Sequence, residues 1–429
     1  MKFVLSALQW FIFILIGAIV APIVIGDAFG LSQTEIASFL QRTIFITGCA
    51  TLLQALFGHR LPIAEGPAGL WWGTFIVYAN LAASQALSTA DALRQLEATM
   101  LLSGLFFLVI GMFKLVNPIK KLFTPLVTGT FLLLLTAQLG SSFVKGMLGV
   151  GYVSEKVEAK IALPALLVFM IAILFSRSRI PFVRRYSILF SLLVGWLLFF
   201  LLRLTKPMEK HASFFQFPEL FAFGKPEFAP GTVITALMLT MLLLTNMIAS
   251  INVVEQTMEK QKPVHYNRSS FIAGINQSLS GFFAGVASVP LSVTAGFLMT
   301  TKTFEKRPFI FANIGIILLS MFPAALSIFA NIPSPVGYAV MFVTISGLAA
   351  LGIQAYHSLA LTERQLFTIS LSFMIGIGSM FIPSASIAHL PNAIMILLNN
   401  GLILGTVACI CIEQIFHFIE TRRNRTDEA

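Results

Sequence analysis

Glu65 lies inside an apolar stretch of the chain, in the segment LPIAEGPAGLWW. A carboxylate within a membrane span is costly to bury and usually serves a function, such as binding a proton or an ion. Trp71 and Trp72 follow it closely, and an indole ring has a flat face on which another ring can stack. The structural alternative is that Glu65 pairs with Arg60 and that the two tryptophans serve packing or an interface.

Uncharged polar side chains also occur within apolar runs, where they suit the recognition of a small polar solute. An asparagine amide both donates and accepts hydrogen bonds, as the edges of planar heterocycles require. Asn246, Ala249 and Asn252 share one helix face because they are spaced at i, i+3 and i+6. The structural alternative is that such amides join neighbouring helices. The uncharged group comprises Gln138, Asn246, Asn252, Asn276, Gln277, Ser292 and Thr294.

Residues 287–301, ASVPLSVTAGFLMTT, interrupt the apolar pattern without adding an ionisable side chain. Together with 61–82, this segment is the weakest of the apolar runs as a continuous helix, because proline and glycine disfavour helix interiors. Paired broken segments in two halves of a chain mark the midplane binding site of many secondary transporters. We therefore expect these two segments to form a solute site.

Composition defines the class of protein that holds these residues. Of 429 residues, 57% are hydrophobic and 11% are charged, which predicts a polytopic α-helical membrane protein. A β-barrel is excluded because the apolar runs are continuous over about 20 residues rather than alternating. The net charge of +10 arises from Lys and Arg in the loops between apolar runs and does not indicate a nucleic-acid partner.

The cysteines and histidines do not form a catalytic or metal-binding pattern. Cys49, Cys409 and Cys411 lie in apolar spans without metal-ligand spacing, and we interpret them as small core residues. The six histidines fall mostly in loops or at span ends. We therefore predict no enzyme activity, no cofactor and no metal. The N-terminal apolar run lacks a small-residue cleavage site and is interpreted as a retained first span.

Basic residues predict the orientation of the spans. If the N-terminus is cytoplasmic, 19 of the 28 Lys and Arg residues fall in cytoplasmic segments, 8 fall outside and Arg42 lies within a span. This bias predicts fourteen spans with both termini in the cytoplasm, and we expect the protein to lie in the plasma membrane. The fourteen candidate spans are 6–26, 36–57, 61–82, 95–116, 122–144, 160–177, 184–203, 231–256, 270–285, 287–301, 308–331, 335–355, 365–385 and 392–416.

Similar motifs in the two halves of the chain predict two inverted repeats. The fifth span opens with FTPLVTGT and the twelfth with IPSPVGY, each with Pro, Val and Gly at similar spacing. These spans lie seven apart, as do the two interrupted spans. Because seven is odd, corresponding spans cross the membrane in opposite directions.

Four motifs resemble, in order and spacing, those of the nucleobase–ascorbate transporters, the family of uracil, xanthine and purine permeases. They are APIVIGDAFGLS after the first span, LPIAEGPAG at the third, FTPLVTGT at the fifth and RSSFIAGINQSLSGFFAGV through the ninth. The resemblance covers nearly the whole chain, and it implies two inverted seven-span repeats. In these, spans 3 and 10 are each a short β-strand followed by a half-helix.

The resemblance also implies that the chain forms two domains, a core domain and a gate domain. A core domain would comprise 1–116 and 231–331, and a gate domain 117–203 and 332–416. Residues 204–230 would form an extracellular loop, and 417–429 a cytoplasmic tail. The family implies an elevator-like movement of core against gate, proton-coupled symport of a nucleobase and a homodimer through the gate domain.

This chain departs from the family pattern at two carboxylates that hold the solute and serve proton coupling. The glutamate of span 8 falls on Ala249, and a following glycine falls on Asn252. The acidic residue of span 10 falls on Val293, and the next asparagine on Thr294. The stacking aromatic of span 3 falls near Gly69.

We therefore expect a solute site in which Glu65 is the candidate for proton coupling. The alternatives are an uncoupled facilitator or carrier of a different small organic solute, and a transport-inactive sensor or partner subunit. The expected site residues are Glu65, Gly69, Trp71, Trp72, Asn246, Ala249, Asn252, Ser292, Val293 and Thr294.

Overall fold

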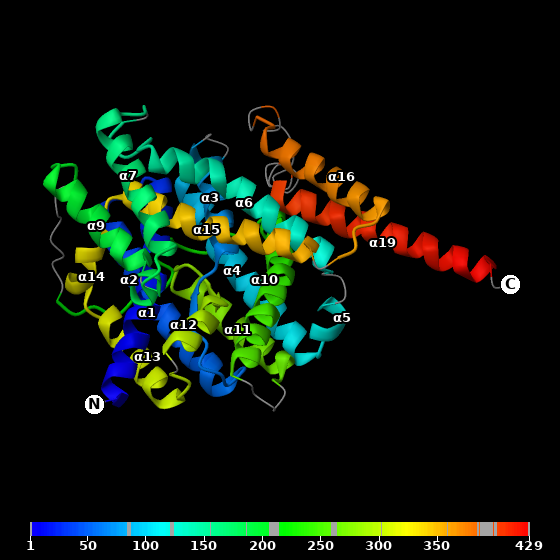
Figure 1. Cartoon of the computed structure of the whole chain (residues 1–429), viewed down its shortest axis with the longest axis horizontal. Coiled ribbons are helices and arrows are strands. Elements are labelled where there is room, and N and C mark those ends of the chain that lie inside the picture. Colours follow the sequence, from blue (N-terminus) through cyan, green and yellow to red (C-terminus); the bar gives the residue numbers. More distant parts are fainter. Residues whose placement is uncertain are drawn as a thin grey trace. The chain divides into compact units, whose positions relative to one another are not determined.

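The structure is a computed structural model, and the chain is mostly helical (Figure 1). It describes residues 2–83, 87–120, 124–154, 156–185, 187–205, 214–258, 264–301, 303–357, 359–383, 386, 398 and 401–427. The helices of the first half are α1 (Lys2–Ala28), α2 (Gln33–Phe57), α3 (Gly69–Ala83), α4 (Thr89–Met112), α5 (Val116–Lys120), α6 (Pro125–Met147), α7 (Ala159–Ser176), α8 (Pro181–Arg185) and α9 (Ser187–Leu201).

The second half continues with α10 (Pro230–Thr257), α11 (Tyr266–Phe282), α12 (Val293–Thr301), α13 (Lys306–Ser320), α14 (Pro323–Ala330), α15 (Ser334–His357), α16 (Glu363–Met380) and α19 (Gly401–Asp427). Two short strands, β1 (Glu65–Pro67) and β2 (Ser288–Pro290), lie in the two segments where the sequence predicts a break.

The chain divides into two compact units, each made of two stretches of sequence. The first comprises Met1–Val116 and Ser142–Val343, and the second Asn117–Ser141 and Thr344–Ala429. In the second unit, α16 and α19 pack along each other. The division into a moving core and a fixed gate concerns function, and it stays a prediction.

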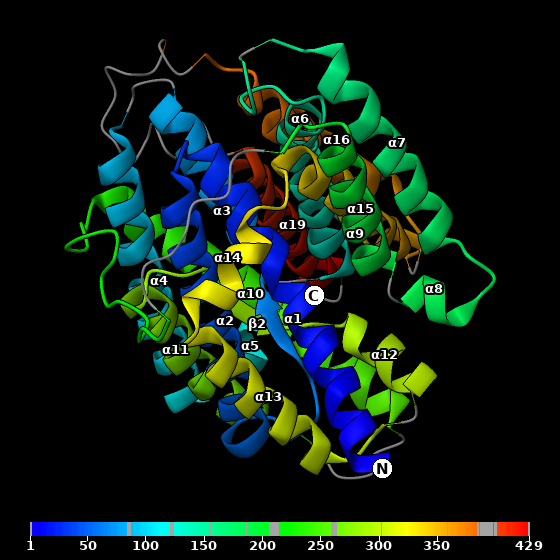
Figure 2. The same cartoon turned by 90° about the vertical axis from the view of Figure 1, so that its left-hand side faces the viewer.

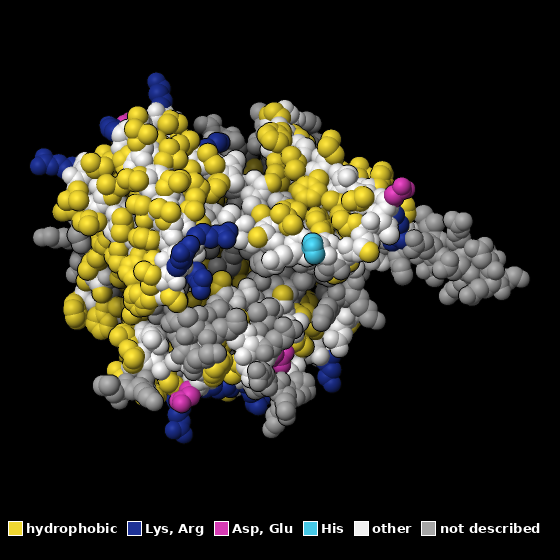
Figure 3. Space-filling view, in the orientation of Figure 1, with side chains coloured by type: hydrophobic (Ala, Val, Ile, Leu, Met, Phe, Trp, Pro, Cys, Tyr) yellow, Lys and Arg dark blue, Asp and Glu magenta, His cyan; other side chains and the backbone are white. Residues whose placement is uncertain are grey.

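Among the described residues, six helices are long and apolar enough to cross a membrane: α1, α2, α4, α6, α7 and α10. Hydrophobic side chains also cover the surface formed by α7 and α9, including Leu163, Leu174 and Phe200, all more than half exposed (Figure 3). Such a surface suits contact with lipid chains rather than water. The count of fourteen spans stays a prediction.

The span predicted at 308–331 is not one straight helix. Helix α13 ends at Ser320, α14 begins at Pro323, and the two axes differ by 95°. Proline lacks an N–H and disfavours the helical conformation in the preceding residue, and Phe322 accordingly has φ −114° and ψ 81°. The motif FPAA contained this signal, but the apolar pattern outweighed it in the sequence interpretation.

Strands β1 and β2 pair antiparallel inside the first unit. The label β2 in Figure 2 marks where this small sheet lies. The paired residues are Glu65 with Pro290, Gly66 with Val289 and Pro67 with Ser288. Just beyond the strands, the Leu291 N–H donates to Ala64 O (2.9 Å) and the Ala68 N–H donates to Ala287 O (3.1 Å).

This pattern explains how two prolines fit into so small a sheet. Hydrogen-bonded and non-hydrogen-bonded pairs alternate along an antiparallel ladder. Because 64–291 and 68–287 are hydrogen-bonded, the pairs that contain Pro290 and Pro67 are the non-hydrogen-bonded ones. Neither proline therefore removes a bond from the ladder, and the Glu65 N–H points away from β2.

Helices α4 and α11 pack closely in the first unit through glycines. A Cβ added at Gly274 would lie 2.7 Å from Leu108 N and 2.8 Å from Gly104 O, and one added at Gly104 would lie 2.9 Å from Gly274 O. Small residues at such crossings let two helix backbones meet within the bilayer. This contact holds α11, and thus the connection to β2, against α4.

We predict that Gly274→Ala destabilises the protein by about 1–3 kcal/mol, because its methyl group meets backbone atoms that cannot rotate away. The matched control is Gly378→Ala in α16, where an added Cβ meets nothing within 4 Å. The measurement is thermal unfolding of both purified variants in detergent. Equal midpoints for the two variants would contradict the close helix contact.

Candidate functional site

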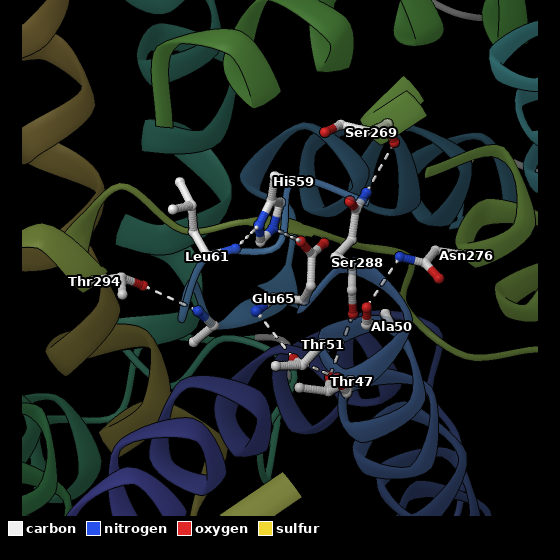
Figure 4. A network of polar contacts seen from close by, with 12 residues as sticks. Thr47, Ala50, Thr51, His59, Leu61, Glu65, Ser269, Asn276, Ser288 and Thr294 are labelled. Carbon is white, nitrogen blue, oxygen red and sulfur yellow. Dashed lines mark hydrogen bonds and ion pairs between the residues drawn. The ribbon is translucent and has the colours of Figure 1, made fainter. Parts of the chain in front are cut away.

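Helix α2 holds both strands through two hydroxyls one turn apart (Figure 4). Thr51 Oγ1 accepts from the Glu65 N–H at 3.1 Å and donates to Thr47 O at 2.7 Å. Thr47 Oγ1 lies 3.3 Å from Ser288 Oγ on β2. The outward-facing N–H of Glu65 thus has a partner, which a buried backbone donor requires.

Glu65 is buried beside His59, which the sequence interpretation did not include in the site. The distance from His59 Nε2 to Glu65 Oε1 is 3.8 Å, and both side chains are at most 1% exposed. Figure 4 shows the imidazole ring directed at the carboxylate. The structure does not show the alternative pairing with Arg60, because Arg60 is exposed and the basic side chain beside the Glu65 carboxylate is His59.

The chain turns sharply between α2 and β1 to place this pair. Gly58 caps α2, and the Arg60 N–H donates to Gln54 O at 3.1 Å. Arg60 has φ 61°, the left-handed conformation that reverses the chain at a helix end. The Leu61 N–H then donates to His59 Nδ1 at 3.0 Å, which sets the orientation of the imidazole ring.

The two tryptophans have different surroundings. The Trp71 Nε1–H donates to Gln277 Oε1 at 2.8 Å, and Gln277 Nε2 donates to Ser288 O at 3.0 Å. Trp71 is therefore part of the frame that holds β2. Trp72 is 4% exposed and stacks on Phe143 with parallel rings whose centroids lie 6.1 Å apart.

The predicted face of α10 is only partly available to a solute. Ala249 is exposed, and Asn246 is half-buried with its Oδ1 accepting from Ser250 Oγ at 3.5 Å. Asn252 Oδ1 accepts from the hydroxyl of Tyr266, which joins α10 to the first turn of α11. Asn252 thus links helices, as the structural alternative proposed for such amides.

The start of α12 contains one exposed and one buried candidate. Val293 is the first residue of α12 and is 60% exposed. Thr294 is fully buried, and its Oγ1 accepts from the Ala64 N–H at 3.3 Å. Ser292 is half-buried, as is Gly69 at the start of α3. Of these four, only Val293 is openly accessible.

Two further buried ionisable side chains, Arg42 and Glu97, lie away from the sheet and share a neighbour, Phe223. Arg42 is 4% exposed and donates to Ala284 O at 3.1 Å, and its guanidinium lies 5.3 Å from the ring centroid of Phe223. Glu97 is fully buried, and its Oε1 accepts from the Phe223 N–H at 3.1 Å. These charges attach part of the predicted 204–230 loop to α2 and α4.

The described residues contain no group of three or more His, Cys, Asp or Glu side chains that could hold a metal ion. The polar network around the sheet is built from hydroxyls, amides, backbone groups and the His59–Glu65 pair. These groups are joined by hydrogen bonds, and the His59–Glu65 pair contains two side chains that can each bind a proton.

Comparisons with known protein families and sequences find permeases. The model of the Permease family matches residues 1–385. YwdJ of Bacillus subtilis (strain 168), provisionally named a purine permease, is 41% identical over 434 residues, 100% of this chain and 98% of that protein. The xanthine permease of the same strain is 22% identical over 423 residues, 96% of this chain and 93% of its own.

Among solved structures, the transmembrane domain of the cyanobacterial bicarbonate transporter BicA matches with a TM-score of 0.65. The match covers 94% of this chain and 96% of that domain at 14% sequence identity. At this identity the likeness concerns the fold alone. It shows that the arrangement of helices seen here is one that membrane transporters use.

We predict that Thr51→Val destabilises the protein by about 1–3 kcal/mol, because valine keeps the shape but leaves the Glu65 N–H without its acceptor. Thr51→Ser, which restores the hydroxyl, is the matched control and is expected to recover most of the loss. Thermal unfolding without any solute measures both. An unchanged midpoint for Thr51→Val would show that this hydroxyl does not support the strand.

Proposed function

This chain belongs to the Permease family of multi-pass membrane transporters, and from that premise we propose that it carries a nucleobase across the cell membrane. The class of solute is a purine, xanthine, uracil or a similar small planar compound. The observation that carries the proposal is the similarity over whole chains to bacterial proteins named as purine and xanthine permeases. The protein is a transporter rather than an enzyme.

We further propose that the chain forms two inverted seven-span repeats and works by an elevator-like movement. Two interrupted segments support this, each a three-residue strand followed by a helix: β1 with α3, and β2 with α12. Both termini in the cytoplasm, and a homodimer formed through the gate domain, belong to the same proposal. They rest on the distribution of basic residues and on the family resemblance.

We place the solute near the start of α12, where Val293 is exposed, and beside Ala249 on α10. Helix N-termini have free N–H groups and a positive dipole end, which favour the acceptor atoms of a polar solute. Thr294 and Trp71 stabilise the structure around this site, Thr294 by accepting a hydrogen bond from the Ala64 N–H and Trp71 by donating one to Gln277. Trp72 is the aromatic candidate with a ring stacked in parallel on another.

Glu65 is the proposed group for proton coupling. Its carboxylate is buried on β1, and its Oε1 has no hydrogen-bond partner among the described residues. A buried carboxylate without a complete set of donors is stable only with a counter-charge or a proton. Protonation of Glu65 would therefore change the energy of the strand on which α3 and the site depend.

A second candidate, an uncoupled facilitator, is favoured by the apolar residues at the two family carboxylate positions, Ala249 and Val293. The same two apolar residues also favour a carrier of a different small organic solute. A transport-inactive sensor or partner subunit is the third reading. Uptake measurements with purified protein separate these from a coupled permease.

We predict that Glu65→Gln abolishes the pH dependence of purine uptake, because glutamine keeps the size of the side chain but cannot exchange a proton. Proteoliposomes assayed between pH 5 and 8 measure this. The control is uptake at equal pH on both sides, which the variant should retain in part. Identical pH profiles for the variant and the natural protein would remove Glu65 from coupling.

We predict that Val293→Trp reduces uptake at least tenfold without loss of stability, because an exposed side chain can grow without disturbing the core. The matched control is Val153→Trp, since Val153 is 62% exposed and Val293 60%. Uptake and thermal unfolding are measured for both. Normal uptake by Val293→Trp would place the solute elsewhere.

A further inference from the structure

We propose that His59 is a positioning residue that stabilises the ionised form of Glu65 by donating a hydrogen bond from Nε2, and thereby sets the pH at which the carrier takes up its proton. This inference rests on the proposed function, since it assigns a partner to the proton-binding group. It is independent of the identity of the solute.

The tautomer of His59 follows from its backbone contact. Nδ1 accepts from the Leu61 N–H at 3.0 Å, so Nδ1 has a lone pair and not a proton. A neutral imidazole has one N–H, which must then be on Nε2. An imidazolium would place an N–H at Nδ1 against the Leu61 N–H, so this contact disfavours the doubly protonated ring.

The Nε2–H of this tautomer faces the carboxylate of Glu65. The separation of Nε2 and Oε1 is 3.8 Å, which is longer than a hydrogen bond. Hydrogen bonds at sites of proton transfer are often long or poorly aligned and tighten only in the working complex. Glu65 Oε1 has no hydrogen-bond partner among the described residues, so the donor on His59 meets an acceptor that needs one.

The other donor near Glu65 does not reach its carboxylate. Thr51 Oγ1 accepts from the Glu65 backbone N–H and gives its own proton to Thr47 O. The hydroxyl is therefore already used. Among the described residues, this leaves the imidazole as the side chain whose donor faces the Glu65 carboxylate.

The elements around Glu65 contain other ionisable groups, and two of them bind backbone carbonyls. Arg268 donates to Phe57 O, and Lys306 donates to Ala55 O at 3.5 Å, so both bind the last carbonyls of α2. Strand β2 and helix α12 contain no ionisable side chain. Helices α1, α2, α10 and α11 and the turn after α2 also contain Lys2, Asp27, Glu35, Arg42, Cys49, Arg60, Glu255, Tyr266 and Arg268, with His265 capping α11.

Two substitutions separate the roles of the two ring nitrogens. The side-chain oxygen of asparagine can replace Nδ1, so His59→Asn keeps the acceptor for Leu61 but removes the donor to Glu65. The longer glutamine places an N–H near the position of Nε2, so His59→Gln keeps the donor to Glu65 and gives up the contact with Leu61.

The experiment measures the pH midpoint of purine uptake in proteoliposomes. Because a donor to the carboxylate favours its charged form, His59→Asn is expected to move the midpoint about one to two units toward higher pH. His59→Gln is expected to stay within about half a unit of the natural protein. In a Glu65→Gln background, His59→Asn is expected to cause no further change.

In the uptake experiment, three outcomes would overturn the proposal: an unchanged midpoint in His59→Asn, an equal shift in both variants, or a shift that persists without Glu65. If the natural protein transports no purine at all, it is the proposed function that fails. A readout that does not depend on the fold of His59→Asn is ¹⁵N NMR of labelled histidine, with the His59 signal assigned by its loss in His59→Gln. A His59 ring that becomes doubly protonated between pH 5 and 8 would also overturn the proposal.

Discussion

The need to satisfy backbone groups in the interior of a membrane protein governs the architecture around the sheet. A chain that leaves the helical conformation within a bilayer exposes N–H and C=O groups that lipid cannot satisfy. Strands β1 and β2 solve this by pairing with each other. Pro67 and Pro290 lie in non-hydrogen-bonded pairs, so they end the strands without removing a ladder bond.

The same constraint explains the polar residues of α2 and α11. The Glu65 N–H, which faces away from β2, donates to Thr51 Oγ1, and Gln277 Nε2 donates to Ser288 O. Because these partners are themselves buried and bonded, the sheet is held from several directions. The starts of α3 and α12, and with them the exposed Val293, are therefore fixed in place by contacts that do not involve the solute.

The sequence was sufficient to predict most helices and the location of both breaks, since these depend on local apolar runs and on proline and glycine. The bend before Pro323 had a local signal that was not used. The roles of Trp71, Asn252 and Thr294 could not be read locally, because each is decided by a partner far away in the chain: Gln277, Tyr266 and Ala64.

His59 illustrates the remaining limit of pattern reasoning. In the sequence it is a histidine at a span end, and nothing in its spacing distinguishes it from His265. Its place beside Glu65 depends on the left-handed conformation of Arg60 and on the Leu61 N–H.

The arrangement also bears on the two absent carboxylates. Val293 and Ala249 are exposed and apolar, so a solute there would meet helix N–H groups without a fixed negative charge beside them. Glu65, by contrast, is on the strand itself and is fully buried. A carboxylate in that position would act on the scaffold that presents the site, because its ionised form depends on the imidazole of His59 in the turn after α2. Coupling through Glu65 would therefore work by changing the stability of one position of the site relative to another, and solute recognition would depend on different residues.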